Sequence, residues 1–193
     1  MKNDTILVGI VALVAGLIIG WMAGQKSSGP APTAVSPGSA PVAGSVPTVN
    51  FQQKINELKA IVANDPKNRQ VWVALGNEYF DSDQPMESVE AYQKALELND
   101  KDPNVLTDQG VMFRRLGWFD RAIDNFRRAN QVDPSHATSL YNLGITYRYD
   151  LQDFAKAQEA WEKFLTVSPS GPGSDRVRQE LEFLKTHPPI PKP

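Results

Sequence analysis

Apolar and polar positions recur at helical spacing through the middle of the chain, most clearly from residue 106 to residue 134. Seven small or apolar residues there fall at offsets 0, 4, 7, 16, 20, 23 and 28: Leu106, Gly110, Phe113, Ala122, Phe126, Ala129 and Pro134. The small members allow two helices to approach closely, and the two phenylalanines fill the space beside them. The final proline ends the second helix, because proline has no N–H and disfavours helix at the preceding residue. The pattern predicts one hairpin of two amphipathic helices.

The same pattern recurs before and after this hairpin. Thirty-four residues earlier the corresponding positions are Trp72, Gly76, Tyr79, Ser88, Tyr92 and Ala95. Thirty-four residues later they are Leu140, Gly144 and Tyr147, followed after a one-residue slip by Ala157, Trp161, Phe164 and Pro169. One hairpin cannot bury such an apolar face alone, so the pattern predicts three stacked hairpins. An ordinary helical bundle with chance periodicity is the alternative, and the in-phase matches disfavour it.

This spacing resembles the tetratricopeptide repeat, whose pattern W-x2-L-G-x2-Y…A-x3-F…P has a period of 34. Four residues match its first half: Trp72, Leu75, Gly76 and Tyr79. The resemblance covers residues 68–169 and implies an all-α fold, a right-handed solenoid of three tetratricopeptide repeats. Ser88 departs from the usual alanine, Asp100 departs from the usual proline, and the bulky Phe164 stands at a position that is normally small.

The expected domain covers residues 50–187, and a Pro-rich tail, 188–193, follows it. A PxxP match in the tail has two interpretations, a ligand motif or a frayed terminus without a function. We predict repeats at about 69–102, 103–136 and 137–171, with capping helices at 51–64 and 174–186. Within the repeats the helices are expected near 70–80, 86–98, 104–116, 119–131, 137–149 and 154–167.

The N-terminal region, 1–26, is predicted to be a membrane anchor. Thr5 to Gly24 is an uncharged stretch of twenty residues, long enough to cross a hydrocarbon core of about 30 Å. A cleaved signal peptide is the alternative, although Trp21 and Met22 do not fit the small residues of a cleavage site. After Lys26 the next basic residue is Lys54, which favours a single-pass protein of the bacterial inner membrane with its repeats in the periplasm.

Small residues recur every four positions in the predicted anchor: Ala12, Gly16, Gly20 and Gly24. Such a stripe lets transmembrane helices pack closely, so it indicates a possible homo-oligomer or membrane partner, although glycine is also common in these helices. Residues 27–49 form a flexible Pro/Ala/Ser/Gly linker without charge, which spans about 26 Å as a coil and about 70 Å as polyproline II.

Composition argues against most chemistry. The chain has 20 basic and 22 acidic residues and no long basic run, which disfavours nucleic acid as a partner. It has no cysteine and only two histidines, so it offers no disulfide, thiolate zinc site or cysteine nucleophile. Nucleotide-binding glycine motifs are also missing. We therefore expect no enzyme activity, no metal and no cofactor.

The resemblance implies that the first helices of successive repeats line a concave groove that binds an extended peptide or a chain terminus. By position, the groove residues are Asn77, Thr107, Val111, Arg114, Arg115, Tyr141, Asn142, Ile145 and Arg148. The three arginines are candidates for holding a carboxylate, or they belong to a solvated face. Val73, Asp108 and Thr138 stand where the carboxylate clamp of chaperone-binding relatives needs Lys or Asn, so that clamp is not expected.

The expected function is a membrane-anchored scaffold that binds a protein or peptide and assists assembly of an envelope complex. The layout is similar to the tetratricopeptide subunits of bacterial c-type cytochrome maturation, which bind the C-terminal part of the apocytochrome. The residues that carry this similarity are Trp72, Leu75, Gly76, Tyr79 and the Asp-Pro pairs at 65–66 and 133–134. A structural membrane oligomer, or an accessory protein of pili or secretion, is the alternative.

Overall fold

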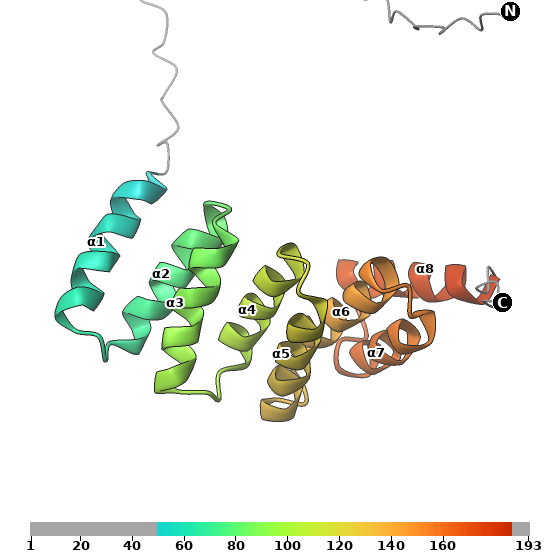
Figure 1. The fold of residues 1–193 in the computed structure, drawn as a ribbon. Coiled ribbons are helices and arrows are strands. Elements are labelled where there is room, and N and C mark those ends of the chain that lie inside the picture. Colours follow the sequence, from blue (N-terminus) through green and yellow to red (C-terminus); the bar gives the residue numbers. More distant parts are fainter. Residues whose placement is uncertain (1–49, 187–193) are drawn as a thin grey trace, which may run out of the picture. The chain divides into compact units, whose positions relative to one another are not determined.

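The computed structural model describes residues 50–186, which form eight α-helices and one π-helical turn, with no strand in that range. The helices are α1 (Phe51–Asn64), α2 (Arg69–Asp81), α3 (Pro85–Leu98), α4 (Pro103–Arg115), α5 (Phe119–Val132), α6 (Ala137–Ile145), α7 (Phe154–Val167) and α8 (Pro172–Thr186), and the π-helical turn η1 (Thr146–Asp150) follows α6. They succeed one another as a row of antiparallel hairpins (Figure 1). The all-α solenoid is thereby confirmed.

Each hairpin packs on the next through the first helix of the later one. Helices α2 and α3, α4 and α5, and α6 and α7 form the pairs, while α4 also packs on α3 and α6 on α5. A continuous apolar cluster runs through α3, α4 and α5 and includes Tyr92, Leu106, Met112 and Phe126. A second cluster joins α6, α7 and α8 around Trp161. The hairpins therefore share their cores, as stacked repeats require.

An aromatic ring on the second helix of each hairpin lies against a glycine on the first. A Cβ built on Gly76 would lie 2.5 Å from the Tyr92 ring, one on Gly110 would lie 2.6 Å from Phe126, and one on Gly144 would lie 2.1 Å from Trp161. Such distances leave no room for a methyl group. The small residue at this position is thus a requirement of helix packing, repeated three times.

The one-residue slip in the third repeat is absorbed by a π-helical turn. We expected a regular helix over 137–149, but α6 ends at Ile145 and the chain continues as η1. There the Leu151 N–H donates to the carbonyl of Thr146, five residues earlier, at 3.1 Å. A π turn accommodates one extra residue. The extra residue lies between Tyr147 and Phe154, which are seven positions apart where Phe113 and Phe119 are six apart.

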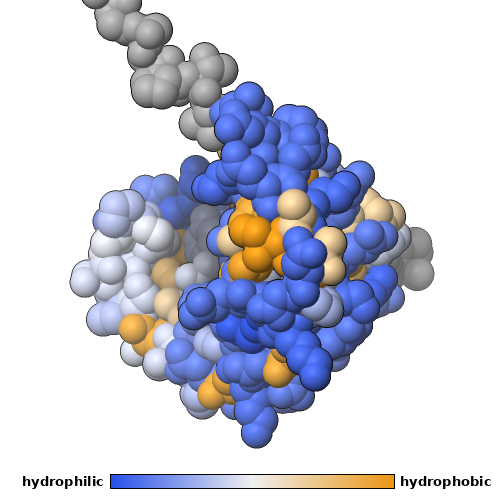
Figure 2. Space-filling view, turned by 90° about the vertical axis from the view of Figure 1, so that its left-hand side faces the viewer, coloured by the Kyte–Doolittle hydropathy of each residue, from blue (hydrophilic) through white to orange (hydrophobic). Residues whose placement is uncertain are grey.

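Helices at both ends of the row cover the repeats. Ile55 and Val62 of α1 pack against α2 beside Leu75 and Tyr79. At the other end, α8 places three apolar side chains in the core around Trp161: Val177, Leu181 and Leu184. Seen from the α1 end, the surface is mostly hydrophilic, with one gathering of apolar residues near its middle and a few separate ones below it (Figure 2).

Phe164 fits its unusual position because α8 begins next to it. Its side chain is buried, and its ring lies 5.6 Å from the ring of Tyr141 in a tilted arrangement. A Cβ on Gly173 would touch Phe164 only at an ordinary 3.6 Å. The larger side chain therefore fills the junction between α6, α7 and α8.

Several sequence predictions lie outside the described residues. These are the anchor at 1–26 with its stripe of Ala12, Gly16, Gly20 and Gly24, the linker at 27–49 and the tail at 188–193. Among the helices between residues 50 and 186, none has both the length and the apolar character needed to cross a membrane.

Candidate binding surface

The first helices of the three repeats, α2, α4 and α6, carry a set of partly or fully exposed side chains that we call the inner surface. Its members are Asn77, Asn104, Asp108, Val111, Tyr141, Asn142 and Ile145. Val111 is half-buried against the core around Leu106, whereas Asn77 and Asn104 are exposed. Six of these seven residues are uncharged, so the surface offers mainly amide groups and apolar patches.

The amide side chains of the inner surface are oriented by bonds within the chain. The Tyr92 hydroxyl donates to Oδ1 of Asn77 at 2.8 Å. The Nδ2 of Asn142 donates to the carbonyl of Thr138 at 2.9 Å. An amide both donates and accepts, and therefore matches the alternating N–H and C=O groups of an extended peptide.

Thr107 does not line this surface. Its side chain is only 1% exposed, and its hydroxyl donates to the carbonyl of Pro103 at 2.7 Å. His136 covers it, with Nδ1 3.4 Å from the Thr107 hydroxyl. The same Nδ1 accepts from the N–H of Ser139 at 3.3 Å and caps α6. Burial lowers the pKa of His136 and so favours the neutral ring that this capping role needs.

The three candidate arginines are each paired with a carboxylate of the chain itself. Two nitrogens of Arg114 bond Asp150, one of them at 3.2 Å. Arg115 bonds Asp83 at 3.1 Å, and its guanidinium lies 4.8 Å from the centre of the Phe80 ring. An external carboxylate would have to displace these partners. The sequence pattern did not predict that the arginines are paired within the chain.

Arg148 is enclosed more completely than the other two. It lies 3.6 Å from Glu180 of α8, and its guanidinium lies between 4.8 and 5.3 Å from the centres of the Tyr149, Phe154 and Phe183 rings. Cation–π contacts and a partly buried ion pair together fix its position. Arg148 therefore holds α8 against the third repeat.

Tyr141 and Ile145 line a pocket of about 330 Å³ between α6, η1 and α8. Tyr149 and Trp161 contribute aromatic surface, and α8 adds Arg176, Val177 and Glu180. The pocket is large enough for one apolar side chain of a ligand. Sequence reasoning placed its first two residues together, but it did not predict that α8 supplies the opposite wall.

Asp108 is the one charged member of the inner surface, and no ion pair of its carboxylate occurs within residues 50–186. Burial raises its pKa, with further contributions from Asp102 and Asp81, to about 6. Sequence reasoning noted Asp108 only as a mismatch to the carboxylate clamp. An unpaired carboxylate at this place favours a ligand that brings a cation or backbone N–H groups.

No group of three or more His, Asp or Glu side chains between residues 50 and 186 is placed to hold a metal ion. The asparagine amides, the Tyr141 pocket and Asp108 give the inner surface hydrogen-bonding groups and an apolar contact area.

Comparison with known proteins identifies the repeats. Tetratricopeptide-repeat models match residues 73–135 and 137–170, together about half of the chain. Among curated proteins, the chain is 31% identical over 97 residues to the small glutamine-rich tetratricopeptide repeat-containing protein 2 of Mycosarcoma maydis, covering 50% of this chain and 27% of the relative. It is 26% identical over 199 residues to the cytochrome c-type biogenesis protein CycH of Pseudomonas aeruginosa, covering 96% of this chain and 45% of the relative. The chain thus spans less than half of the length of either.

Solved structures show the same fold. The crystal structure of MamA matches with a TM-score of 0.66 and 26% identity, covering 70% of this chain and 77% of MamA. The first tetratricopeptide domain of Spaghetti (RPAP3), bound to an HSP90 peptide, matches with a TM-score of 0.56 and 21% identity, covering 63% of this chain and 96% of that domain. From the matched repeats, their spacing and the stacked hairpins it follows that the chain belongs to the tetratricopeptide-repeat family.

Proposed function

We propose that this protein is a scaffold that binds an extended segment or a chain end of a partner protein along its inner surface. The observation that carries the proposal is the set of uncharged side chains on α2, α4 and α6, where the amides of Asn77 and Asn104 are exposed and that of Asn142 is half-buried. A surface of this kind suits recognition of a polypeptide rather than bond-making chemistry. A binding protein is therefore favoured over an enzyme.

The pairing of the arginines changes how the ligand is held. Arg114 is paired with Asp150, Arg115 with Asp83 and Arg148 with Glu180. We therefore assign the three arginines to holding the repeats in place. The ligand backbone would bond the asparagine amides, and one apolar side chain would enter the pocket beside Tyr141 and Ile145. A cationic side chain of the ligand would pair with Asp108.

The process in which the scaffold acts is proposed to be c-type cytochrome maturation in the bacterial envelope. Support comes from CycH, since its similarity extends over 96% of this chain and so beyond the repeats themselves. The proposal includes an anchor at 1–26 in the inner membrane and repeats that face the periplasm. The partner in that setting would be a c-type apocytochrome that has not yet received haem.

The proposal is tested by titrating the detergent-purified full-length chain with fluorescently labelled, haem-free cytochrome c. Replacing both Asn77 and Asn142 by alanine should weaken binding by about tenfold, because each lost hydrogen bond contributes roughly 0.5–1.5 kcal/mol. Gln158→Ala on α7 is the matched control, since it removes an amide on the other side of the hairpin and should leave binding unchanged. Equal binding by the double variant, or no binding by the unmodified chain, would contradict the proposal.

A further inference from the structure

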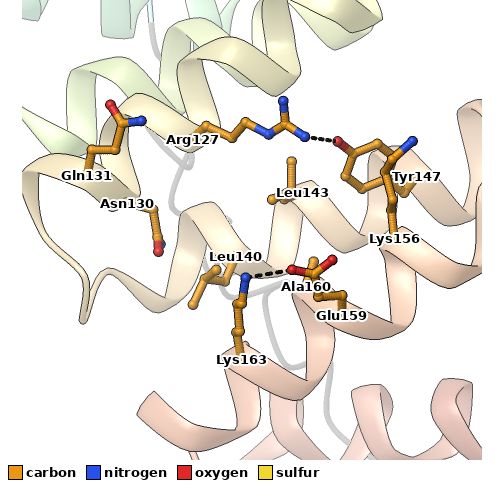
Figure 3. A pocket seen from close by; sticks show the side chains of 10 residues that line it. All are labelled: Arg127, Asn130, Gln131, Leu140, Leu143, Tyr147, Lys156, Glu159, Ala160 and Lys163. Carbon is orange, nitrogen blue, oxygen red and sulfur yellow. Dashed lines mark hydrogen bonds and ion pairs between the residues drawn. The ribbon is translucent and has the colours of Figure 1, made fainter.

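A second pocket, separate from the one beside Tyr141, lies in the groove between α5 and α7 (Figure 3). It encloses about 270 Å³. Its lining consists of Arg127, Asn130 and Gln131 of α5, Leu140 and Leu143 of α6, Tyr147 of η1, and Lys156, Glu159, Ala160 and Lys163 of α7. No residue of the inner surface contributes to it.

The floor of this pocket is apolar. Leu140 and Ala160 belong to the packed core and expose only a small part of their surface to it, and Leu143 is half-buried beside them. The ring of Tyr147 closes one side. A volume of this size accepts a single leucine-sized side chain and its attached polar group, but it is small for a cofactor or nucleotide.

The rim of the pocket is positively charged. Arg127, Lys156 and Lys163 surround it, and Glu159 is the one acidic lining residue. Lys163 bonds Glu159 at 2.7 Å, and Lys156 turns to Asp153 at 2.5 Å. These two pairs leave Arg127 as the lining cation without a salt bridge among residues 50–186, although, after Lys163, its charge helps to lower the pKa of Glu159.

Arg127 differs from the three arginines near the inner surface. Its guanidinium donates to the Tyr147 hydroxyl at 2.9 Å, and within residues 50–186 it forms no ion pair. Figure 3 shows the Arg127 guanidinium at the edge of the pocket, with one nitrogen held by the Tyr147 hydroxyl. A guanidinium held in this way is prepared to accept a planar carboxylate through two parallel bonds.

We propose that this pocket binds a peptide segment in which a carboxylate adjoins a leucine-sized apolar side chain. The side chain contacts Leu140, Leu143 and Ala160, and the carboxylate bonds Arg127, since Lys156 and Lys163 are already paired with Asp153 and Glu159. The carboxylate comes from an acidic side chain or from a chain terminus. Because no residue of the inner surface lines this pocket, the scaffold can hold one partner at each of the two places.

The test uses the full-length chain and three N-acetylated peptides. The first is Gly-Ser-Gly-Glu-Leu with a free terminus, the second is the same peptide with an amidated terminus, and the third is amidated Gly-Ser-Gly-Gln-Leu, which has no carboxylate. Methyl NMR signals of Leu140 and Leu143 report binding at millimolar peptide. The first peptide should shift these signals with at least tenfold higher affinity than the third. Similar binding of the second peptide would identify the acidic side chain as the source of the carboxylate, and binding of the first alone would identify the chain terminus.

Two arginine variants on α5 complete the test. Arg127→Gln should weaken binding of the carboxylate peptides by about tenfold, because a charge-assisted bidentate bond is lost. Arg128→Gln makes the same change one residue away, outside this pocket, and should leave the affinity unchanged. The proposal is overturned if the three peptides bind alike, if none shifts the Leu140 and Leu143 signals, or if Arg127→Gln binds as the unmodified chain does. None of these outcomes depends on the apocytochrome experiment.

Discussion

Replacing Gly144 by alanine is expected to lower the free energy of unfolding by about 3 kcal/mol, near the upper end for overpacking a core. The added Cβ would lie 2.1 Å from Nε1 of Trp161. The Trp161 side chain is fully buried, and its Nε1 donates to the carbonyl of Tyr141 at 3.3 Å. The ring therefore cannot move aside without losing both packing and a hydrogen bond. Urea unfolding of the full-length chain, followed by circular dichroism, measures the change.

Gly173→Ala provides the matched control for this prediction. It makes the same chemical change in α8, where the new Cβ would meet only Phe164 at 3.6 Å. Since that contact is ordinary and alanine favours helix over glycine by up to about 1 kcal/mol, stability should stay equal or rise slightly. Equal losses in the two variants would mean that the close approach of α6 and α7 does not determine the effect.

Asp108→Asn is expected to stabilise the protein at neutral pH but not in acid. The carboxyl has a pKa of about 6 in the fold, above its ordinary value of 3.8, chiefly because burial disfavours the charged form. The unfolded chain loses this proton near pH 4, so the folded state loses relative stability as the pH rises from about 4 to about 6. Above that range the asparagine variant should gain about 1–2 kcal/mol, less than the shift alone implies because the group is partly solvated.

This second prediction is measured as the difference in urea unfolding free energy between variant and unmodified chain at pH 4 and pH 8. The difference should be close to zero at pH 4 and fully developed at pH 8. Asp124→Asn, a substitution at an exposed carboxylate of α5, should change stability little at either pH. A difference at Asp108 that is independent of pH would contradict the assigned cause. A ligand cation that pairs with Asp108 would also bind more tightly above pH 6.

The helices were predictable because the repeat spacing restricts where they begin and end. The pattern around Gly110 and Phe126 specifies both which residues face the neighbouring helix and how far apart they lie. The position of the π turn was harder to predict from the sequence. The one-residue slip in the repeat spacing is visible there, but several segments could have accommodated the extra residue. Tyr147 keeps its place in the core only because η1 takes up that residue.

The candidate site was predictable only in outline. Helical spacing placed Arg114 and Arg148 on one side of the solenoid, but their partners, Asp150 and Glu180, come from distant parts of the chain. Thr107 followed the same spacing, and it is buried because His136 from the next hairpin covers it. Spacing along one helix cannot reveal such neighbours. The pocket between α5 and α7, which Arg127 lines, could not be predicted for the same reason, since α5, α6 and α7 each contribute only a part of its lining.

The most direct measurement of the central claim is photocrosslinking from the inner surface in living cells. A photoreactive amino acid is placed at Asn77 or Asn104 of the full-length chain, both exposed on the inner surface, and at Glu162, exposed on α7, as the reference position. The account predicts that the two inner positions capture the same partner, identified by mass spectrometry as a c-type apocytochrome, and that Glu162 does not. Capture of that partner from Glu162 but from neither asparagine would show that the inner surface is not where the ligand lies.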